Sequence, residues 1–443
     1  MKIMNVFLGV VIICAINICM LSCKKETTSS QESKEPVIVS FWPQSGYGNE
    51  VVSILGRQFG NDRSALSVTF SDREAVILES STDEVKVAVP VNGTSGLVQL
   101  RVGDRVFDVG TFNYTEPVNI YKVITYTGSG MTGKSDGPLL QATFHNPEGV
   151  TLDGAGNLYV TDRNNNAIRK VGTDGMVTTL LGGTDGFVDG PLEIAKLDYP
   201  WKSAVDETGN IYIADRDNHS IRKISIDGMV STLAGTGQAG FVDGPGEIAR
   251  FNQPIDVAVD LSGNVYVADN NNHRIRKIDP NGMVSTVAGD GTAGFSDGMA
   301  TSSRVRNPSG IETDEAGNVY IADRNNHRIR KLSVDGHLST ISGLGTAGAV
   351  DGSLAQASFS QPYGIALDND GKLYVADLGS NKVRLINIGS ETVLTIAGSA
   401  AGFADGIGAA ARFSQPTDIA VDDEGNIYVA DLGNARIRMI FVD

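Results

Sequence analysis

The chain has 443 residues, and its 36 Lys and Arg against 52 Asp and Glu give a formal net charge of −16 at pH 7. Residues 117–443 hold 26 of the basic and 39 of the acidic residues, a net charge of −13. Because a nucleic-acid-binding face needs basic residues to neutralise phosphates, this balance argues against RNA or DNA as a partner. Acidic polymers are disfavoured for the same reason, unless one local patch departs from the average.

The N-terminus predicts export. Lys2 precedes an apolar stretch, residues 6–21, that leads directly into Ser22 and Cys23. The stretch resembles a bacterial lipoprotein signal, which implies removal of residues 1–22 and acylation of Cys23. An uncleaved transmembrane helix is the alternative interpretation.

The cysteines favour the lipoprotein interpretation. Cys14, Cys19 and Cys23 are the only three in the chain, and the first two would leave with the signal. The mature chain would keep one cysteine, consumed by lipid, and would have no disulfide despite export. We therefore expect an exported protein that is anchored by lipid to the outer membrane and exposed at the cell surface.

A small β domain follows the anchor. Residues 23–35 are polar and lack aromatics, which predicts a flexible tether. Residues 36–116 contain short alternating strands split by turn residues, as in a β-sandwich. They resemble an IPT/TIG domain, an immunoglobulin-like module, at Pro43, Gly46, Gly48, Gly56, Phe59, Pro90, Phe112 and Tyr114. The resemblance implies a spacer. We expect Trp42, at a strand end, to be a packing residue, with a direct binding role as the alternative.

An internal repeat fills residues 117–443. An aspartate that ends a predicted strand recurs at intervals of 53, 54, 54, 54 and 54 residues, as Asp162, Asp215, Asp269, Asp323, Asp377 and Asp431. A fixed period of this size is typical of propellers and solenoids, because one unit cannot bury its own faces. No copy has the long run of helical period that a helical solenoid needs.

Each copy resolves into four predicted strands, as the third copy shows. Asp256–Asp260 is a short apolar run, and Asn264–Asp269 alternates with β-branched and aromatic residues. Arg274–Ile278 alternates charged with aliphatic residues, and Met283–Gly289 closes the unit. Four antiparallel strands per unit form the blade of a β-propeller.

The ends of the repeat region predict how the ring closes. The last copy stops after its third strand, Arg436–Val442, whereas residues 118–130 match a fourth strand placed before the first copy. Pairing of the segment near Tyr121 with the strand near Ile440 would complete six blades and leave no open sheet edge.

The repeated unit resembles the NHL repeat. Its pattern is P-x-x-[IV]-A-[VL]-D-x-x-G-N-[IV]-Y-[VI]-A-D-x-x-N-x-R-I-R-K. The resemblance implies a propeller that binds proteins, RNA or sugars, with lyases and hydrolases as a minority, so it supports the fold more than the function. The prediction is an all-β chain, an immunoglobulin-like β-sandwich followed by a six-bladed NHL β-propeller.

Features present in every blade are better explained by the blade than by a single site. We expect the strand-ending aspartates to pair with the arginines seven residues later, and the tyrosines of the second strands to form the core between blades. The sequence DNDG at 368–371 hints at calcium, but the same position is a hairpin turn in every copy, which favours a turn.

No metal site is predicted from the histidines. His219, His273 and His327 occupy one loop position in adjacent blades. Zinc ligands must lie within about 2.1 Å of one ion, and equivalent positions in neighbouring blades cannot converge that closely. We therefore expect these histidines to be structural, and no cofactor is predicted.

Function is expected where the copies differ. The residues after the recurring proline, where the inner strand enters the channel, change from blade to blade, and Trp201 and Tyr363 would offer aromatic platforms to a sugar ring. The alternative is that these side chains fill the channel. The candidate ligand-binding residues at the channel mouth are Glu148, Tyr199, Trp201, Lys202, Asp256, Arg306, Tyr363 and Asp418.

The hypothesis is a non-catalytic surface lipoprotein that binds an extracellular glycan and passes it to an outer-membrane transporter. A protein-protein interaction scaffold on the cell surface is one alternative. A propeller lyase or hydrolase with a site at the channel mouth is another. The inner-strand starts contain no histidine, and only His145 lies in a flanking loop, so no catalytic residue is predicted.

Overall fold

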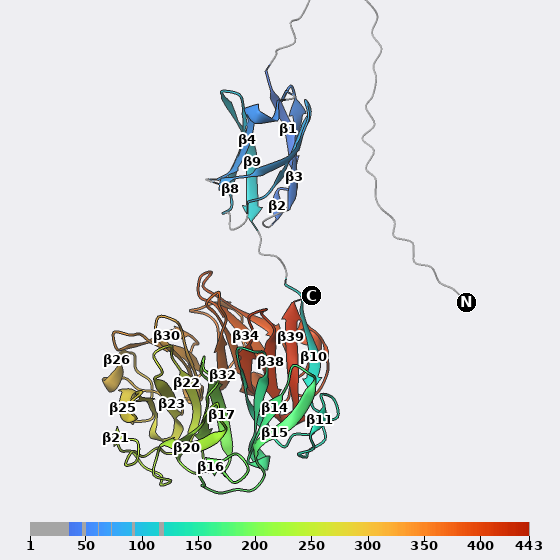
Figure 1. The fold of residues 1–443 in the computed structure, drawn as a ribbon. Helices are drawn as coiled ribbons and strands as arrows, with labels where there is room; N and C mark the ends of the chain where they lie inside the picture. The colour runs from blue at the N-terminus through green and yellow to red at the C-terminus, as the bar shows by residue number, and fades with distance from the viewer. Residues whose placement is uncertain are drawn as a thin grey trace, which may run out of the picture. The chain divides into compact units, whose positions relative to one another are not determined.

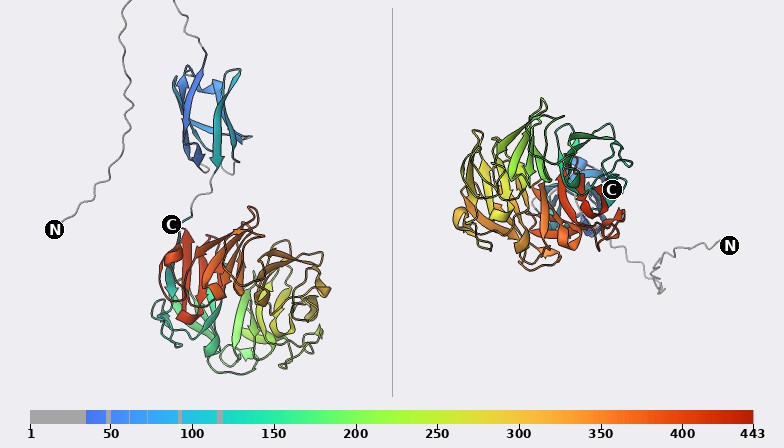
Figure 2. Two further views of the ribbon diagram at one scale, coloured as in Figure 1. Left: turned by 180° about the vertical axis from the view of Figure 1, so that it is seen from behind. Right: turned by 90° about the horizontal axis from the view of Figure 1, so that it is seen from below.

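The computed structural model describes residues 35–46, 50–60, 62–71, 73–90, 94–114 and 119–442. These residues form two compact all-β units that divide between Val118 and Asn119 (Figures 1 and 2). The predicted signal and Cys23 lie outside the described residues. In the part of the chain that the structure describes, no helix has the length and apolar character needed to cross a membrane.

The first unit is the predicted sandwich of two sheets. One sheet has the strand order β1-β3-β7-β6, and the other has the order β2-β9-β8-β4-β5. Val52, Val68 and Phe112 are fully buried in the single core between the two sheets. The strands are β1 (Val37–Trp42), β2 (Ser45–Gly46), β3 (Val51–Arg57), β4 (Leu66–Phe70), β5 (Arg73–Glu74), β6 (Val76–Ser80), β7 (Glu84–Ala88), β8 (Gly96–Val102) and β9 (Arg105–Tyr114).

Trp42 does not pack as expected. It is the last residue of β1, and it is 76% exposed, whereas Phe41 beside it is buried in the core. Because successive residues of a strand point to opposite faces of a sheet, burial of Phe41 directs Trp42 to the outer face. The prediction that Trp42 is a packing residue is wrong.

The second unit is the predicted propeller, with six sheets arranged around a common centre (Figures 1 and 2). The innermost strands contact one another in a closed cycle and form the channel wall. They are β12 (Pro147–Leu152), β17 (Pro200–Val205), β22 (Pro254–Val259), β27 (Gly310–Thr313), β32 (Pro362–Leu367) and β37 (Pro416–Val421). The second strands are β13 (Leu158–Asp162), β18 (Ile211–Asp215), β23 (Val265–Asp269), β28 (Val319–Asp323), β33 (Lys372–Asp377) and β38 (Ile427–Asp431).

The outer strands of each blade follow in antiparallel order. The third strands are β14 (Ala167–Val171), β19 (Ser220–Ile224), β24 (Arg274–Ile278), β29 (Arg328–Leu332), β34 (Lys382–Asn387) and β39 (Arg436–Val442). The fourth strands are β15 (Met176–Gly182), β20 (Met229–Ala234), β25 (Met283–Ala288), β30 (His337–Ser342), β35 (Thr392–Ala397) and β10 (Tyr121–Thr127).

Each sheet has a fifth strand that the sequence does not predict. It is only two residues long and pairs with the start of the fourth strand at the outer edge of the blade. A segment this short carries no detectable alternation of polar and apolar residues, so its sequence pattern is that of a turn. The six strands are β11 (Gly137–Pro138), β16 (Gly190–Pro191), β21 (Gly244–Pro245), β26 (Gly298–Met299), β31 (Gly352–Ser353) and β36 (Gly406–Ile407).

The ring closes as predicted. β10 pairs antiparallel with β39, with Tyr121 opposite Val442 and Val123 opposite Ile440. The sixth blade therefore has the order β36-β10-β39-β38-β37, in which its fourth strand comes from the start of the propeller. This pairing covers the sheet edges that an open array would leave exposed.

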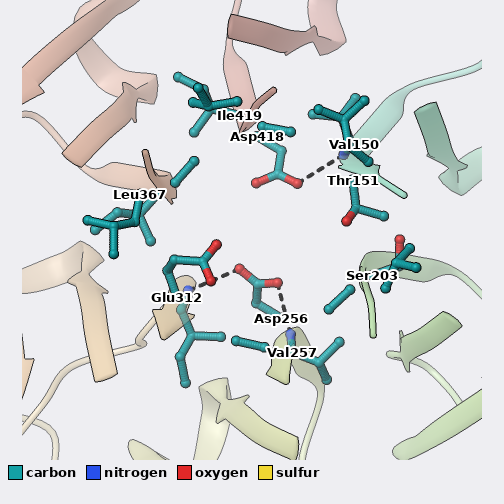
Figure 3. Close-up of a pocket in the computed structure, with 18 of the residues that line it drawn as sticks. Val150, Thr151, Ser203, Asp256, Val257, Glu312, Leu367, Asp418 and Ile419 are labelled. Atoms are coloured by element: carbon teal, nitrogen blue, oxygen red, sulfur yellow. Dashed lines mark hydrogen bonds between the residues drawn. The ribbon is translucent and has the colours of Figure 1, made fainter. Parts of the chain in front are cut away.

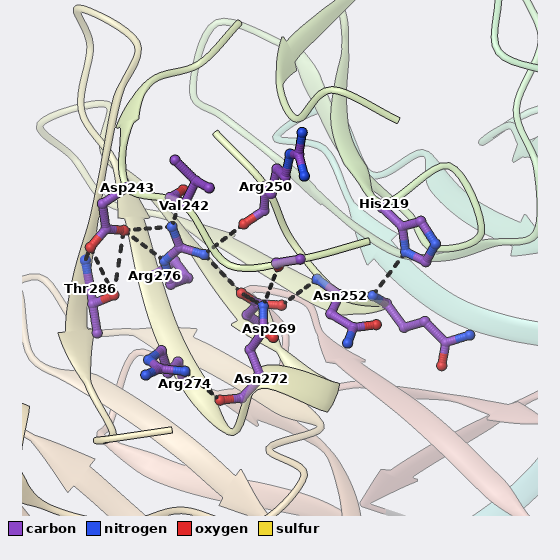
Figure 4. A network of polar contacts seen from close by, with 12 residues as sticks. His219, Val242, Asp243, Arg250, Asn252, Asp269, Asn272, Arg274, Arg276 and Thr286 are labelled. Carbon is purple, nitrogen blue, oxygen red and sulfur yellow. Dashed lines mark hydrogen bonds and ion pairs between the residues drawn. The ribbon is translucent and has the colours of Figure 1, made fainter. Parts of the chain in front are cut away.

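A buried arginine joins three segments of each blade, as Arg276 does in the third blade (Figure 4). Its Nη1 donates to Asp269 Oδ2 at 2.8 Å and to the Arg250 carbonyl at 3.0 Å. Its Nη2 donates to the Val242 carbonyl at 2.8 Å and to the carboxylate of Asp243. One guanidinium group thus ties the second strand, the third strand and the long connection between blades together.

The same arrangement is present in all six blades, so the predicted pairing of the strand-ending aspartate with the arginine is confirmed. The six arginines have no exposed side-chain surface. Each is paired with a second aspartate from the G-x-x-D-G segment of the connection, which the sequence analysis does not predict. The triads are Asp162–Arg169–Asp136, Asp215–Arg222–Asp189, Asp269–Arg276–Asp243, Asp323–Arg330–Asp297, Asp377–Arg384–Asp351 and Asp431–Arg438–Asp405.

The tyrosines of the second strands pack between blades, as expected. Tyr266, for example, is 8% exposed and shares a core with Ile311 and Ile321 of the next blade. The DNDG segment is a turn, as expected, because Asp368 accepts the backbone amides of Asp370 and Lys372. Equivalent buried tyrosines close the cycle, namely Tyr159, Tyr212, Tyr266, Tyr320, Tyr374 and Tyr428.

The histidines bridge adjacent blades. His219, His273 and His327 lie in the left-handed backbone region, and Nδ1 of each accepts a backbone amide of the next blade at 3.1 to 3.2 Å. Asn166 and Asn381 accept the same bond through their side-chain oxygens. Burial lowers the pKa of all three imidazoles. The structural role predicted for them is confirmed.

We expect replacement of Arg276 by Met to lower the free energy of unfolding by about 3–5 kcal/mol, because it leaves two carboxylates without their buried cation. Arg274→Met is the matched control, since Arg274 donates only to backbone carbonyls. Urea denaturation of both variants would measure the difference. Equal losses of unfolding free energy in the two variants would show that the buried triad stabilises the propeller no more than the contacts of Arg274 do.

The histidine bridges predict an acid-sensitive propeller. Nδ1 of each histidine must be unprotonated to accept the inter-blade hydrogen bond. Because folding lowers the pKa of these histidines, their contribution to the stability of the propeller is complete above the unfolded pKa of about 6.5 and is lost as pH falls. Replacing all three histidines by Asn, the residue used in two other blades, should remove this loss. Thermal melts at several pH values between about 7 and 5 would check it, and a parallel decline in both proteins would contradict the assignment.

Candidate functional site

The channel mouth is built by the first residues of the six inner strands, directly after the recurring proline. The strand-ending aspartates pair with these prolines in the sheets, so the loops after the second strands surround the same end of the channel. The first two residues after the prolines differ between blades. They are Glu148-Gly149, Trp201-Lys202, Ile255-Asp256, Ser309-Gly310, Tyr363-Gly364 and Thr417-Asp418.

Lys202 holds two carboxylates together across the channel. Its Nζ lies 2.9 Å from Asp418 Oδ1 and 3.3 Å from Asp256 Oδ2, and its side chain is fully buried. Asp418 also accepts the amide of Val150 at 2.9 Å, and Asp256 accepts the amide of Ile311 at 3.1 Å (Figure 3). Together with the strand of Lys202 itself, strands from five blades are therefore joined through one ammonium group.

The charges of this cluster perturb one another. Burial alone would lower the pKa of Lys202, but the carboxylates of Asp256 and Asp418 more than offset it, so the pKa is raised and the ammonium is retained. Burial raises the pKa of both carboxyl groups above the ordinary range. Two negative charges share one positive charge here, so the cluster takes up a proton more readily than free carboxylates do.

Gly149 and Gly364 allow the inner strands to approach closely at this level. A Cβ at Gly149 would lie 2.9 Å from the Lys202 Cα, and a Cβ at Gly364 would lie 2.6 Å from the Asp418 Cα. Real Cβ atoms do not tolerate such contacts with backbone. Three of the six positions at this level are glycine, Gly149, Gly310 and Gly364, and the other three carry Lys202, Asp256 and Asp418.

A cavity of about 190 Å³ extends from this cluster along the inner strands, away from the mouth (Figure 3). The carboxyl groups of Asp256, Asp418 and Glu312 point into it, beside Thr151 and Ser203. Burial, with the nearby charge of Asp418, raises the pKa of Glu312 to about 7. Glu312 is not a sequence-predicted site residue. The sequence feature that could have identified Glu312 is that the matching position in the other blades is Thr or Ala.

Two aromatic residues cover the ion cluster on the side of the mouth. Nε1 of Trp201 donates to the hydroxyl of Tyr363 at 2.7 Å, across the channel. The Tyr363 ring lies 5.1 Å from the Lys202 ammonium and is 2% exposed, whereas Trp201 is half-buried. The two predicted aromatic residues are brought together, but Tyr363 is packed inside the channel and does not form an open platform.

Arginines from the loops surround these rings. The guanidinium carbons of Arg163 and Arg216 lie 4.7 and 4.5 Å from the Trp201 ring centre, and that of Arg324 lies 4.9 Å from the Tyr363 ring centre. Each of these arginines directly follows a strand-ending aspartate. The other blades carry Asn270, Leu378 and Leu432 at that position, a variation in the sequence that could have identified the arginines.

Glu148 is the acidic residue of this layer. Its Oε2 accepts Arg163 Nη1 at 2.7 Å, and its side chain is 1% exposed. Burial raises its pKa to about 7, although Arg163 and Lys202 act in the opposite direction. The carboxyl group also hydrogen-bonds the Tyr363 hydroxyl. Glu148 therefore belongs to the same network as the two aromatic residues.

Tyr199 and Arg306 lie at the edge of this group. Tyr199 has φ +54, and its ring centre lies 5.5 Å from the Arg163 guanidinium carbon. The five equivalent positions carry Asn or Gln, of which Asn adopts the left-handed conformation at lower cost than Tyr. The Arg306 side chain is exposed, and its charge acts on His273 and His327 rather than on the ion cluster.

Comparison with known families identifies both units. Residues 36–116 match the IPT/TIG domain, and residues 144–171, 197–224, 251–278, 305–332 and 413–438 match the NHL repeat. The chain contains an IPT/TIG domain and NHL repeats. The fifth NHL blade is not among the matched segments, yet its Asp377 and Arg384 pair as in the others. There Ser380 replaces the usual Asn and donates to Asp377 through its hydroxyl.

The chain is similar to known sequences and to solved structures. A region of 287 residues is 31% identical to Protein SUPPRESSOR OF QUENCHING 1 of Arabidopsis thaliana, covering 60% of this chain and 27% of that protein. The chain thus spans well under half of this relative. A structural genomics protein from Bacteroides thetaiotaomicron has TM-score 0.58, 22% identity and coverage of 93% and 99% of the two chains. An auxiliary nutrient binding protein from Bacteroides ovatus has TM-score 0.57, 21% identity and the same coverage. Both structures share the fold.

Lys202→Met should destabilise the NHL propeller by about 3–5 kcal/mol near neutral pH, because Asp256 and Asp418 lose their only bridging cation. Both carboxyl groups already have raised pKa values. A folded pKa above the unfolded value means that stability increases as pH falls, so the variant should regain stability in acid. Urea denaturation at several pH values would measure this.

A triple variant provides the control for this prediction. Adding Asp256→Asn and Asp418→Asn to Lys202→Met removes the unpaired charges, and it should restore most of the stability and abolish the gain of stability in acid that Lys202→Met shows. A Lys202→Met protein as stable as the parent would show that the ammonium does not hold the channel together.

Proposed function

We propose that this protein is a non-catalytic lipoprotein whose NHL propeller binds an extracellular ligand at the channel mouth, a glycan captured for uptake at the cell surface. The observation that carries the proposal is the set of side chains around Trp201 that the blade itself does not require. The buried triads and tyrosines recur in every blade, whereas Trp201, Tyr199 and Arg324 do not. Trp201 and Tyr199 have no counterpart in the other blades, and arginine stands at the Arg324 position in only two others, so these side chains serve one place in the ring.

Tyr199 is the most informative of these residues. A bulky side chain with positive φ is an unfavourable local choice, and none of the other blades carries an aromatic residue there. Retaining it beside Arg163 and Trp201 is consistent with a role in contacting a ligand. Aromatic rings with polar groups beside them suit a sugar, because the ring face packs on apolar C–H groups while the polar groups bind hydroxyls.

The context of the propeller also supports the proposal. The N-terminal sequence around Cys23 resembles a lipoprotein signal, and the IPT/TIG domain would serve as a spacer. The similar Bacteroides ovatus structure is described as an auxiliary nutrient binding protein. Anchor, spacer and terminal propeller together form an arrangement suited to presenting a binding face outside the cell, beside an outer-membrane transporter.

The two tryptophans allow a direct test of the site. Trp42 and Trp201 are the only tryptophans in the chain, so Trp42→Phe in residues 36–443 leaves the channel-mouth indole as the only tryptophan. We expect a glycan found by array screening to change the Trp201 emission in a saturable manner, because binding alters the polar surroundings of the ring. Fluorescence titration would give the affinity.

The reciprocal variant supplies the control. Trp42→Ala removes the exposed tryptophan of the other domain and should leave retention in affinity electrophoresis unchanged, whereas Trp201→Ala should weaken it about tenfold or more. Binding that persists unchanged in Trp201→Ala would reject the channel mouth as the site. Failure of every glycan on the array would reject a glycan ligand and favour a protein partner.

A further inference from the structure

Arg324 has an unusual environment for an arginine in this propeller. It begins the short 3-10 turn η5 (Arg324–Asn326) at the mouth. Its Nε is buried without a hydrogen-bond partner, and its guanidinium group forms no hydrogen bond or ion pair with any residue that the structure describes. Its only close partner is the Tyr363 ring, 4.9 Å away. A partly buried cation without a counter-charge is costly, and a ligand could supply the missing partner.

Its neighbours at the mouth are already paired. Arg163 donates to Glu148 at 2.7 Å, and Arg216 donates to Asp217 at 2.6 Å. The three guanidinium groups meet around the bonded ring pair of Trp201 and Tyr363 and face only these two carboxylates. Arg324 is therefore the one of these three arginines whose charge no ion pair offsets, within a propeller whose formal net charge is −13.

The N–H groups of Arg324 have no acceptor among the residues that the structure describes. A guanidinium group stacked on an aromatic ring keeps its N–H groups in its own plane, where they can still donate. The planar pair of N–H groups matches the two oxygens of a carboxylate and also suits sulfate. A lysine would not provide this two-point contact, and Arg324 stands where two other blades carry leucine.

We propose that the channel mouth recognises an anionic substituent on its glycan, a carboxylate or a sulfate, through Arg324, with Arg163 and Arg216 beside it. This inference rests on the proposed function and names its ligand class. One guanidinium group without an ion pair suits one anionic group at a time. The acidic remainder of the propeller disfavours a polyphosphate such as RNA. The hydrophobic side of the mouth includes Leu378, which packs with Trp201 and Tyr363 and could contact the apolar face of the same sugar.

The test uses matched pairs of glycans. Uronic-acid oligosaccharides, namely galacturonate, glucuronate and mannuronate oligomers, are titrated into residues 36–443 carrying Trp42→Phe, each beside its carboxyl-reduced neutral form. A sulfated galactan oligosaccharide beside its desulfated form makes the second arm. We expect at least one acidic form to bind about 10- to 100-fold more tightly than its neutral counterpart, the gain expected from charge-assisted hydrogen bonds. The arm that shows the gain identifies the anionic group.

Two variants assign the effect to Arg324. Arg324→Gln should lower the affinity for the acidic form about 10- to 100-fold and bring it to the level of the neutral form. Arg412→Gln removes an exposed arginine of the sixth blade and should change neither affinity. Melting temperatures of both variants would show that each remains folded, and Arg324→Lys should restore only part of the preference.

The outcomes separate this inference from the proposed function. Neutral and acidic forms that bind equally, or an Arg324→Gln protein that keeps the preference, would overturn anion recognition while the propeller remains a glycan-binding protein. A Trp201 signal that responds to neither acidic nor neutral glycans would overturn both.

Discussion

Closure of the ring is the constraint on which the rest of the propeller depends. The sixth blade takes its fourth strand from residues at the opposite end of the repeat region, through the pairing of β10 with β39. Thr125 of that strand donates to Asp405, as Thr286 does to Asp243 within the third blade. Asp405, the outer carboxylate of the sixth triad, thus gains a hydrogen bond from a residue that arrives only when the ring shuts. Closure therefore helps to hold the carboxylate that pairs with the buried Arg438.

A ring of equivalent blades separates structural from functional residues. Whatever a blade needs for its own packing must appear about every 54 residues, as the buried arginines and tyrosines do. At the channel mouth the equivalence ends. A tyrosine occupies a left-handed position that otherwise carries Asn or Gln, and three of six loops begin with arginine. The side chains that break the pattern are in contact with one another through Trp201 and Tyr363, so the departures form one group and are not scattered around the ring.

The sequence predicted the elements governed by local pattern and missed those created by the ring. The strands, the closure, the aspartate–arginine pairs and the tyrosine core follow from periodicity and repetition. The fifth strand was missed because two residues carry no periodic signal, and Trp42 was misplaced because Phe41 beside it takes the core position. The candidate residues of the mouth were identified by their variation, but their contacts were not. Lys202 reaches Asp256 and Asp418 in two other blades, and such distances across a channel depend on the register of every inner strand at once.

Opposite charges are arranged in layers along the channel, and this affects which ligands can be selected. The carboxyl groups of Asp256, Asp418 and Glu312 gather around the cavity, Lys202 bridges two of them, and the arginines lie beyond Trp201 and Tyr363. The field of the acidic propeller repels polyanions over a range set by the Debye length, about 8 Å in physiological salt. The arginines act only at contact distance, through hydrogen bonds that a single anionic group can satisfy. A small acidic ligand therefore gains the contacts while avoiding most of the repulsion, whereas a long polyanion meets the repulsion along its whole length. Long-range repulsion by the acidic propeller and short-range attraction by the arginines thus make the mouth selective for ligands with isolated anionic groups over ligands with many closely spaced ones.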